Sequence, residues 1–330
     1  MHKERRITIN LRTPRVSIVM TAYQASHFVP AVLQQLRALT FTDFEVIVVD
    51  DGSTDDTAAL LRVGAELDER IRVIEQFPNA GAGAARRAGF SAATGEFVWN
   101  IDMDDEWPPD ALETLASASE GVDLVFAPAW RRSPDGAVRL MPSPDLSALS
   151  GAREVLTMML SGAITGHLWN KFVRRSLLTP DVYTDARIHS DLVMVARLSA
   201  RLQAVRAVDR PVYTYVENPG SNIRSSKPRG DALDDVALSV AESVAFAAPE
   251  LIDSSLYARF FARAIVLSRL RDAVRGDYSP DERRTRYRSA RAAVRPAHIF
   301  ALLRTRDVKN TGLLLIAWAT PPVFRRLMAR

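Results

Sequence analysis

The chain has 330 residues, of which 47% are hydrophobic and 25% charged, and it contains no cysteine. This length supports one large domain or two ordinary ones with a substantial core, and the composition excludes global disorder. The lack of cysteine excludes disulfides, thiolate zinc sites, iron–sulfur clusters and cysteine nucleophiles. No apolar stretch reaches the roughly 20 residues of a membrane-spanning helix, so we expect a soluble, cytoplasmic body.

The net charge of +4 is unevenly distributed. Residues 259–330 carry 17 basic and 5 acidic residues, whereas the first 258 residues carry 26 and 34. A basic tail behind an acidic body predicts an anionic partner, either a membrane surface or nucleic acid; a solvated arginine-rich surface is the alternative. Only Tyr287 is available for base stacking in the basic stretch 283–295, so we expect no nucleic-acid partner.

The first half of the chain alternates strand-like and helix-like segments. Strands are expected at 16–20, 44–49, 71–75 and 96–101, and helices at 29–39, 57–69 and 82–93. Alternation of this kind predicts βαβ units and a mainly parallel sheet flanked by helices.

The second half is less regular. We expect a strand at 123–127, a hairpin or loop over 128–144, helices at 153–160 and 192–204, a strand at 211–216, and an almost entirely helical pattern from residue 230 onward. A break near 225–230 suggests three parts, namely a basic leader (1–14), an α/β domain (15–225) and an Arg/Ala-rich helical region (226–330).

Polar clusters at 21–23, 50–56 and 102–105 each follow a predicted strand. Ligands bind beyond the carboxyl ends of parallel strands, so we expect these clusters to converge on one crevice. In the second cluster, a carboxylate would accept hydrogen bonds from a nucleotide base or ribose, and Gly52 would allow a ligand to approach the backbone closely. Helix capping by this turn is the alternative.

Asp102 and Asp104 stand two residues apart at a strand end. They would present oxygens to one hard cation, with diphosphate oxygens and water as its other ligands. The alternative is an acidic loop before a helix that begins near Pro108.

Several segments together resemble the family-2 glycosyltransferases of the GT-A fold. These are VSIVMTAY at 16–23, DDGSTD at 50–55, NAGAGAAR at 79–86, GEFVWNIDMDD at 95–105, WNKFVRRS at 169–176, DLVM at 191–194 and PVYTY at 211–215. The resemblance covers about residues 15–225. It implies a GT-A fold, a Rossmann-like α/β architecture with a mainly parallel sheet flanked by helices, to which this chain adds a C-terminal helical extension. It also implies an inverting, metal-dependent enzyme that moves a sugar from a nucleoside-diphosphate sugar to a hydroxyl acceptor in cell-surface polysaccharide or glycoconjugate synthesis.

The resemblance assigns expected roles to individual residues. Thr21, Tyr23 and Asp51 would hold the base and ribose, with Arg86 on the same side. Asp102 would face the ribose or the metal, and Asp104 would be the main protein ligand of Mg²⁺ or Mn²⁺.

Asp191 matches the second acidic residue of the family's Glu-Asp pair, where the general base is expected. The preceding residue is Ser190 instead of the usual Glu. If the base were that Glu, the chain would lack it, so a catalytically degenerate binding or scaffold protein is the alternative. Asp191 would serve equally well as a cap for the helix predicted from Leu192.

Three further side chains are candidates for substrate contacts. Arg224 lies on a loop that the family often closes over the diphosphate. Trp169, like Trp107, would stack on an acceptor sugar or pack in the core. His189 would orient an acceptor or simply be exposed.

Near the C-terminus, the apolar segment 313–324 includes Trp318 and is followed by Arg325 and Arg326. This composition suits a segment lying in the membrane interface against anionic lipid. We therefore expect peripheral attachment to the inner face of the plasma membrane, where a lipid-linked glycan would be the acceptor. The alternative is a helix docked on the catalytic domain.

Overall fold

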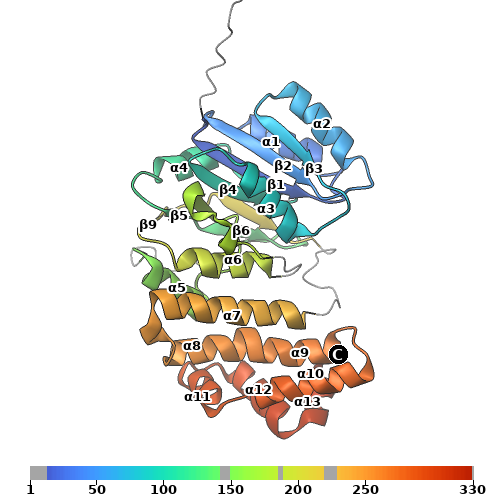
Figure 1. Ribbon diagram of the computed structural model, residues 1–330, viewed down its shortest axis with the longest axis vertical. Helices are drawn as coiled ribbons and strands as arrows, with labels where there is room; N and C mark the ends of the chain where they lie inside the picture. Colours follow the sequence, from blue (N-terminus) through green and yellow to red (C-terminus); the bar gives the residue numbers. More distant parts are fainter. Residues whose placement is uncertain (1–12, 142–148, 185–188, 219–228, 329–330) are drawn as a thin grey trace, which may run out of the picture.

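A computed structural model describes residues 13–141, 149–184, 189–218 and 229–328 (Figure 1). Its first half alternates strand and helix as the sequence predicts. The elements are β1 (Val16–Ala22), α1 (Val29–Arg37), β2 (Phe44–Asp50), α2 (Thr57–Leu67), β3 (Ile71–Glu75), α3 (Ala82–Ala92) and β4 (Phe97–Asp102).

Shorter elements follow up to residue 218. They are α4 (Ala111–Ser117), β5 (Leu124–Phe126), β6 (Ala129–Arg132), β7 (Val138–Leu140), α5 (Ala152–Ser161), β8 (Lys171–Arg174), α6 (Ser190–Ser199), β9 (Val205–Ala207) and β10 (Tyr213–Val216). The hairpin expected after residue 128 is β6–β7, which pair antiparallel.

Two parts of this region differ from the prediction. The helix predicted over 192–204 ends at Ser199, because the chain turns so that β9 can pair with β5. The strands β8 and β9 were not predicted. Each is three or four residues long, too short for a periodic pattern, and strand pairing fixes both.

The main sheet has seven strands in the order β3-β2-β1-β4-β8-β5-β9. Strands β3, β2, β1 and β4 are parallel, while β8 runs antiparallel to β4 and β5. A smaller sheet, β10-β6-β7, joins it through an antiparallel bridge between Glu106 and Thr214. The mainly parallel GT-A sheet implied by the resemblance is confirmed, with an antiparallel strand inserted into it.

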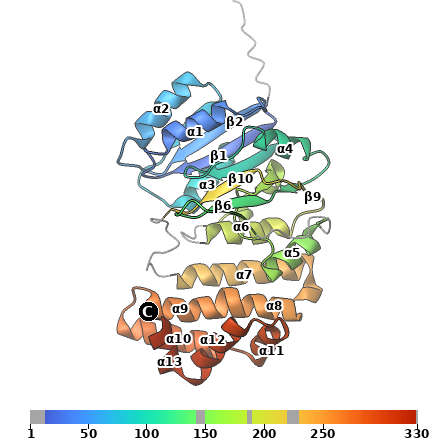
Figure 2. The same ribbon diagram turned by 180° about the vertical axis from the view of Figure 1, so that it is seen from behind.

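Alternate residues of the central strands point to opposite faces of the sheet. Val19 and Ile47 lie in the core shared with α3, α5, α6 and α7, whereas Ile18 and Val46 lie in the core shared with α1, α2 and α4. Because both faces are covered, these strands are continuous apolar runs. Figures 1 and 2 show α1 and α2 on one side of the sheet and α6 on the other.

The C-terminal region is helical, as predicted. It comprises α7 (Gly230–Ala247), α8 (Ser255–Phe260), a π-helical turn (Phe261–Val266), α9 (Leu267–Arg275), α10 (Pro280–Ala292), α11 (Pro296–Arg304), α12 (Val308–Ala319) and α13 (Pro321–Met328). Helix α7 packs on α6, and the later helices stack progressively farther from the sheet (Figures 1 and 2). Within the part of the chain that the structure covers, no helix combines the length and apolarity needed to cross a bilayer.

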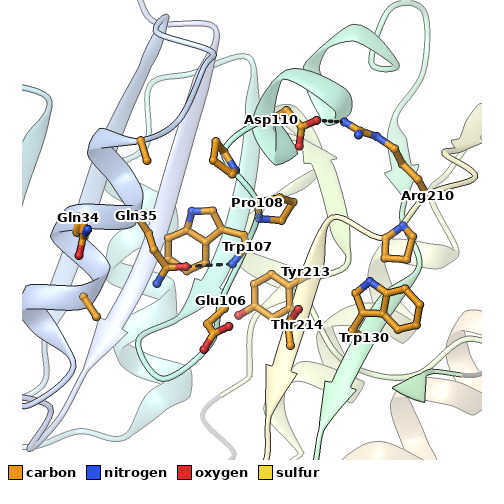
Figure 3. Close-up of a pocket in the computed structure, with 14 residues that line it drawn as sticks. Gln34, Gln35, Glu106, Trp107, Pro108, Asp110, Trp130, Arg210, Tyr213 and Thr214 are labelled. Atoms are coloured by element: carbon orange, nitrogen blue, oxygen red, sulfur yellow. Dashed lines mark hydrogen bonds and ion pairs between the residues drawn. The ribbon is translucent and has the colours of Figure 1, made fainter. Parts of the chain in front are cut away.

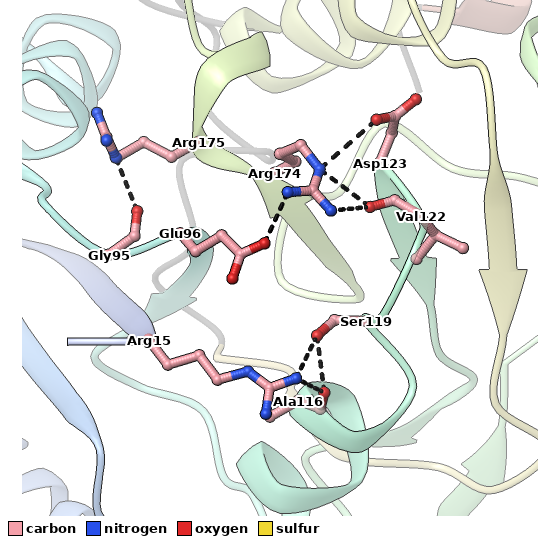
Figure 4. A network of polar contacts seen from close by, with 9 residues as sticks. All are labelled: Arg15, Gly95, Glu96, Ala116, Ser119, Val122, Asp123, Arg174 and Arg175. Atoms are coloured by element: carbon pink, nitrogen blue, oxygen red, sulfur yellow. Dashed lines mark hydrogen bonds and ion pairs between the residues drawn. The ribbon is translucent and has the colours of Figure 1, made fainter. Parts of the chain in front are cut away.

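Arginine side chains tie the amino-terminal edge of the main sheet to its surroundings (Figure 4). Arg15 donates to the carbonyl oxygen of Ala116 over 2.9 Å. Arg174 forms a 2.7 Å ion pair with Glu96, and Arg175 donates to the carbonyl oxygen of Gly95. These contacts lie at the opposite end of β4 from its acidic residues, so they stabilise the sheet that positions the site.

Candidate functional site

Three parallel strands, β1, β2 and β4, end side by side at one edge of the main sheet. Thr21 pairs in register with Asp102, and Ala22 pairs with Asp50. The polar clusters that follow these strands therefore converge, as expected for carboxyl ends of parallel strands. Tyr23, just beyond β1, has an exposed side chain at this edge.

Asp51 is buried just beyond the end of β2. Its two carboxylate oxygens accept hydrogen bonds from the backbone N–H groups of Ala80 and Gly81, over 2.9 and 2.7 Å. Asn79 donates to the carbonyl oxygen of Asp51 over 2.8 Å. Asp51 thus positions the turn that begins α3, the helix that carries Arg86.

The turn from Asp50 to Thr57 is held by its own side chains. The Asp55 carboxylate accepts from the backbone N–H and the hydroxyl of Thr57 and from the backbone N–H of Ser26. Its slight burial raises the pKa of Asp55, but these bonds outweigh that effect and lower the pKa to about 2. The capping alternative therefore describes Asp55, at the start of α2.

The structure gives Gly52 a role within the fold itself. Its φ of +74° favours glycine, and an added Cβ would lie 3.0 Å from the backbone nitrogen of Asn79. The close approach that requires a glycine is therefore between two segments of this chain, and a ligand is not needed to explain it.

Arg86 connects the end of β4 to the start of α6. Its guanidinium lies 3.7 Å from the Asp102 carboxylate and donates to the Ser190 hydroxyl over 3.3 Å. Its Nε is buried without a hydrogen-bond partner among the described residues. Arg86 therefore brings together Asp102 and the residue that precedes Asp191, although the three residues are far apart in sequence.

Asp102 lies in a concentration of negative charge. Burial raises the pKa of its carboxyl group, Arg86 lowers it, and the nearby Asp104 and Asp191 raise it further. The repulsion between these three carboxylates indicates a site that would be stabilised by positive charge.

A buried tyrosine holds the acidic loop after β4. The Tyr213 hydroxyl donates to the Asp105 carboxylate over 2.7 Å and accepts from the backbone N–H of Asp102 over 3.1 Å. Asn218 donates to the Asp104 carboxylate over 2.7 Å. Sequence reasoning assigned no role to Tyr213 or Asn218, because the strand end that carries them is more than 100 residues from the loop.

The residues present fit a hard divalent cation. Asp102 and Asp104 offer carboxylate oxygens, the ligands that Mg²⁺ and Mn²⁺ prefer. Within the described ranges, no group of three or more His, Cys, Asp or Glu side chains could hold a metal ion. The two aspartates would therefore form an open site, in which ligand oxygens and water complete the coordination.

Asp191 lies in the first turn of α6, and one of its carboxylate oxygens accepts from the backbone N–H of Leu192 over 2.9 Å. Because α6 begins at Ser190 with His189 as its N-cap, Asp191 is not the N-cap residue that was the alternative. Its second carboxylate oxygen is not used in the bond to Leu192. His189, at the N-cap of α6 with a φ of +62°, is partly buried, and burial lowers the pKa of its imidazole.

Two basic residues interact electrostatically with Asp191. Lys171 is 3% exposed and donates to the carbonyl oxygens of Thr165 and His167 and to the side chain of Asn170. Burial lowers the pKa of Lys171 to about 7, and Asp191 opposes that shift. Burial also lowers the pKa of His167, which Asp191 likewise opposes.

The acceptor role expected for Trp169 is not supported by its position. Its side chain is 3% exposed and stacks on Tyr213 at 4.8 Å and on His167 at 4.8 Å. At this exposure the ring packs in the core, which was the alternative, and it offers little surface to a sugar. Arg224, the residue expected to contact the diphosphate, lies outside the described residues.

The chain was compared with known proteins. Residues 17–177 match the family model described as Glycosyl transferase family 2. EpsH of Bacillus subtilis, named as a glycosyltransferase, is 32% identical over 170 residues, which are 51% of this chain and 49% of EpsH. TuaG of the same organism, named as a teichuronic acid biosynthesis glycosyltransferase, is 35% identical over 100 residues, 30% of this chain and 40% of TuaG. This chain therefore spans about half or less of the length of these two curated relatives.

The fold matches a solved structure over most of its length. The structure of S. aureus TarS 1–349 in complex with UDP-GlcNAc has a TM-score of 0.68 and 19% identity, covering 91% of this chain and 90% of that one. This similarity supports the fold assignment. The family model matches the segment that contains Asp51, Arg86, Asp102 and Asp104. Over residues 17–177, about half of its length, the chain is therefore similar to glycosyl transferase family 2.

Proposed function

We propose that this protein transfers a sugar from a nucleoside-diphosphate sugar to a hydroxyl group of a glycan or lipid-linked acceptor, in the synthesis of a cell-surface polysaccharide or glycoconjugate. The observation that carries the proposal is the convergence of Asp102, Asp104, Arg86 and Asp191 at one edge of the sheet. The match to the family model and the names of EpsH and TuaG support the same reaction class.

The donor would lie along the ends of β1, β2 and β4. Thr21, Tyr23 and Asp51 are the residues we assign to the base and ribose, with Arg86 on the same side. Mg²⁺ or Mn²⁺ held by Asp104 and Asp102 would offset the negative charge of the departing nucleoside diphosphate. We place Arg224 over the diphosphate from the sequence alone.

Asp191 is our candidate for the general base. Its carboxylate would take the proton of the acceptor hydroxyl as that oxygen attacks the anomeric carbon, while the bond to the diphosphate breaks. A single displacement of this kind inverts the anomeric configuration and needs no protein nucleophile. His189, two residues before Asp191, would lie on the acceptor side.

The C-terminal helices suit contact with an anionic membrane surface. The large exposed apolar side chains of α11, α12 and α13 are Phe300, Leu303, Val308, Leu315, Trp318, Val323 and Leu327. Exposed basic residues lie among them, namely Arg304, Arg306, Lys309, Arg325 and Arg326. Leu314, Ala317 and Phe324 of α12 and α13 instead pack into the C-terminal core. One face of α12 and α13 thus packs within the C-terminal region, and we assign the exposed side chains to contact with lipid.

Nucleotide binding tests the proposed function. We expect one of UDP, GDP, CDP or dTDP to raise the melting temperature when Mn²⁺ is present, because a ligand at 100 times its Kd stabilises the native state by about 2.7 kcal/mol. Asp104→Ala should abolish the metal-dependent rise, whereas Asp253→Ala, which changes an exposed aspartate on the connection to α8, should keep it. If none of the four nucleotides shifts the melting temperature, the result favours the alternative, a catalytically degenerate binding or scaffold protein, over a transferase.

A further inference from the structure

A pocket of about 860 Å³ lies between α1, the loop after β4 and the β10–β6 sheet (Figure 3). Its volume is within the range of roughly 300–1,000 Å³ typical of small-molecule sites. None of the residues assigned to the donor, the metal or the base lines it. The pocket is therefore separate from the site described above, although it borders the same loop.

The lining combines flat apolar surfaces with a few polar groups. Trp107, Pro108, Pro109 and Pro211 supply apolar surface, and the Trp130 ring, 39% exposed, forms part of the opposite wall. Gln34 of α1 is exposed at the pocket, and its side chain forms no hydrogen bond with the described residues.

A buried donor in this lining has no partner. Trp107 is 6% exposed, and its indole N–H makes no hydrogen bond with any described residue. Leaving a buried N–H unsatisfied costs about 1–3 kcal/mol. This nitrogen has almost no exposed surface, so a ligand oxygen would reach it only if the Trp107 side chain moved.

The charges around the pocket are paired with each other. Asp110 and Arg210 form a 2.7 Å ion pair, and Glu106 binds Arg132 through both of its carboxylate oxygens. A carboxylate already neutralises each of these arginines, which reduces their attraction for a phosphate or carboxylate ligand. The pocket thus favours an uncharged ligand with apolar faces and hydroxyl groups, which is the chemistry of a pyranose ring.

The pocket is linked to the acidic loop through one side chain. Tyr213 borders the pocket but is fully buried, and its hydroxyl group holds Asp105 and the backbone of Asp102. Gln35 also accepts from the backbone N–H of Trp107, which fixes the loop against α1. A ligand in the pocket would therefore lie against the wall that Tyr213 supports from behind, next to the metal-binding loop.

We propose that this pocket binds uncharged sugar units of an extended glycan acceptor, at a distance from the unit that receives the new sugar. The use of the pocket by an acceptor rests on the proposed function, whereas saccharide binding itself does not. The pocket would raise affinity for a long acceptor without taking part in the chemistry.

The test is direct binding of neutral tetrasaccharides to the full chain. Maltotetraose, cellotetraose and chitotetraose would be titrated against the protein, with saturation-transfer NMR as the readout. We expect at least one of them to bind, and Trp130→Ala to weaken its binding about tenfold, a change in Kd that corresponds to about 1.4 kcal/mol. Ala31→Trp, which places a large ring in the pocket from the exposed face of α1, should prevent binding without touching the core.

Matched variants elsewhere control for general effects. Phe246→Ala removes an exposed ring from α7, and Ala245→Trp adds one there; both should leave saccharide binding unchanged. If none of the three tetrasaccharides binds, or if binding is unaffected by both Trp130→Ala and Ala31→Trp, the inference is wrong. Nucleotide binding is measured on the same preparations. If a nucleotide binds and no tetrasaccharide does, this inference fails while the proposed function stands.

Discussion

Asp51 illustrates how one side chain at the candidate site also stabilises the fold. It is 3% exposed and accepts the backbone N–H groups of Ala80 and Gly81. We expect Asp51→Ala to lower the free energy of unfolding by about 1–3 kcal/mol, because two partly buried backbone N–H groups lose a charged acceptor. Urea denaturation measures this change.

The matched control is Asp51→Asn, which keeps one carbonyl oxygen as an acceptor. It should cost less than the alanine substitution. Equal stability of Asp51→Ala and the unsubstituted chain would contradict the structural role assigned to this carboxylate. The increase in melting temperature caused by the nucleotide, measured for the same variants, tests the ribose contact that we propose for Asp51.

The acidic residues at the strand ends could be identified from the sequence, whereas their partners could not. Asp102 and Asp104 follow a long apolar strand, so their place at the sheet edge follows from local pattern. Tyr213 and Asn218 are 108 and 114 residues from the aspartates they bind. Nothing local signals these contacts, which depend on how the small sheet docks against the main one.

At the scale of secondary-structure elements, α3 must pack closely against the sheet. An added Cβ on Gly89 would lie 2.5 Å from a methyl group of the buried Val19. We predict that Gly89→Ala destabilises the protein by about 1–3 kcal/mol, the usual cost of overpacking, although alanine is the better helix former. Thermal or urea unfolding checks this prediction.

Gly312 of α12 provides the comparison, because an added Cβ there meets nothing within 4 Å. Gly312→Ala should therefore stabilise the chain by up to about 1 kcal/mol. If both alanine substitutions stabilised the protein equally, the packing of α3 on β1 would be looser than the structure indicates.

The sequence predicted long elements well and short ones poorly. The strands β1 to β4 are buried on both faces and read as apolar runs, and the helices between them have clear apolar faces. Strands β8 and β9 are short, and both pair with β5. Their sequences are too short to show the alternation of apolar and polar residues that indicates a strand. The helix α6 was predicted too long because its apolar residues continue into the turn before β9.

At the scale of the whole molecule, the C-terminal helices lie at the end farthest from β1–β3 (Figure 1). We expect the protein to float with vesicles that contain phosphatidylglycerol and to be released by high salt, since each basic residue near the surface contributes about 1 kcal/mol. Pure phosphatidylcholine vesicles should retain little protein.

Replacing exposed apolar residues tests the same surface. The double substitution Leu315→Ser with Trp318→Ser should reduce flotation, because both side chains are exposed on α12. Leu67→Ser, which removes an exposed leucine from α2, is the control. Undiminished binding by the α12 variant would show that this helix does not face the lipid.

The most direct test of sugar transfer at this site is turnover by Asp191→Asn. The asparagine keeps the oxygen that accepts from Leu192, so α6 should begin normally, but it cannot take a proton. With the nucleotide-sugar identified by thermal shift and a hydroxyl acceptor present, we predict that release of nucleoside diphosphate falls about 10²–10⁴-fold, with nucleotide binding unchanged. Turnover at the rate of the unsubstituted protein would contradict the assignment of Asp191 as the base, and absence of turnover in the unsubstituted protein would contradict the transferase account itself.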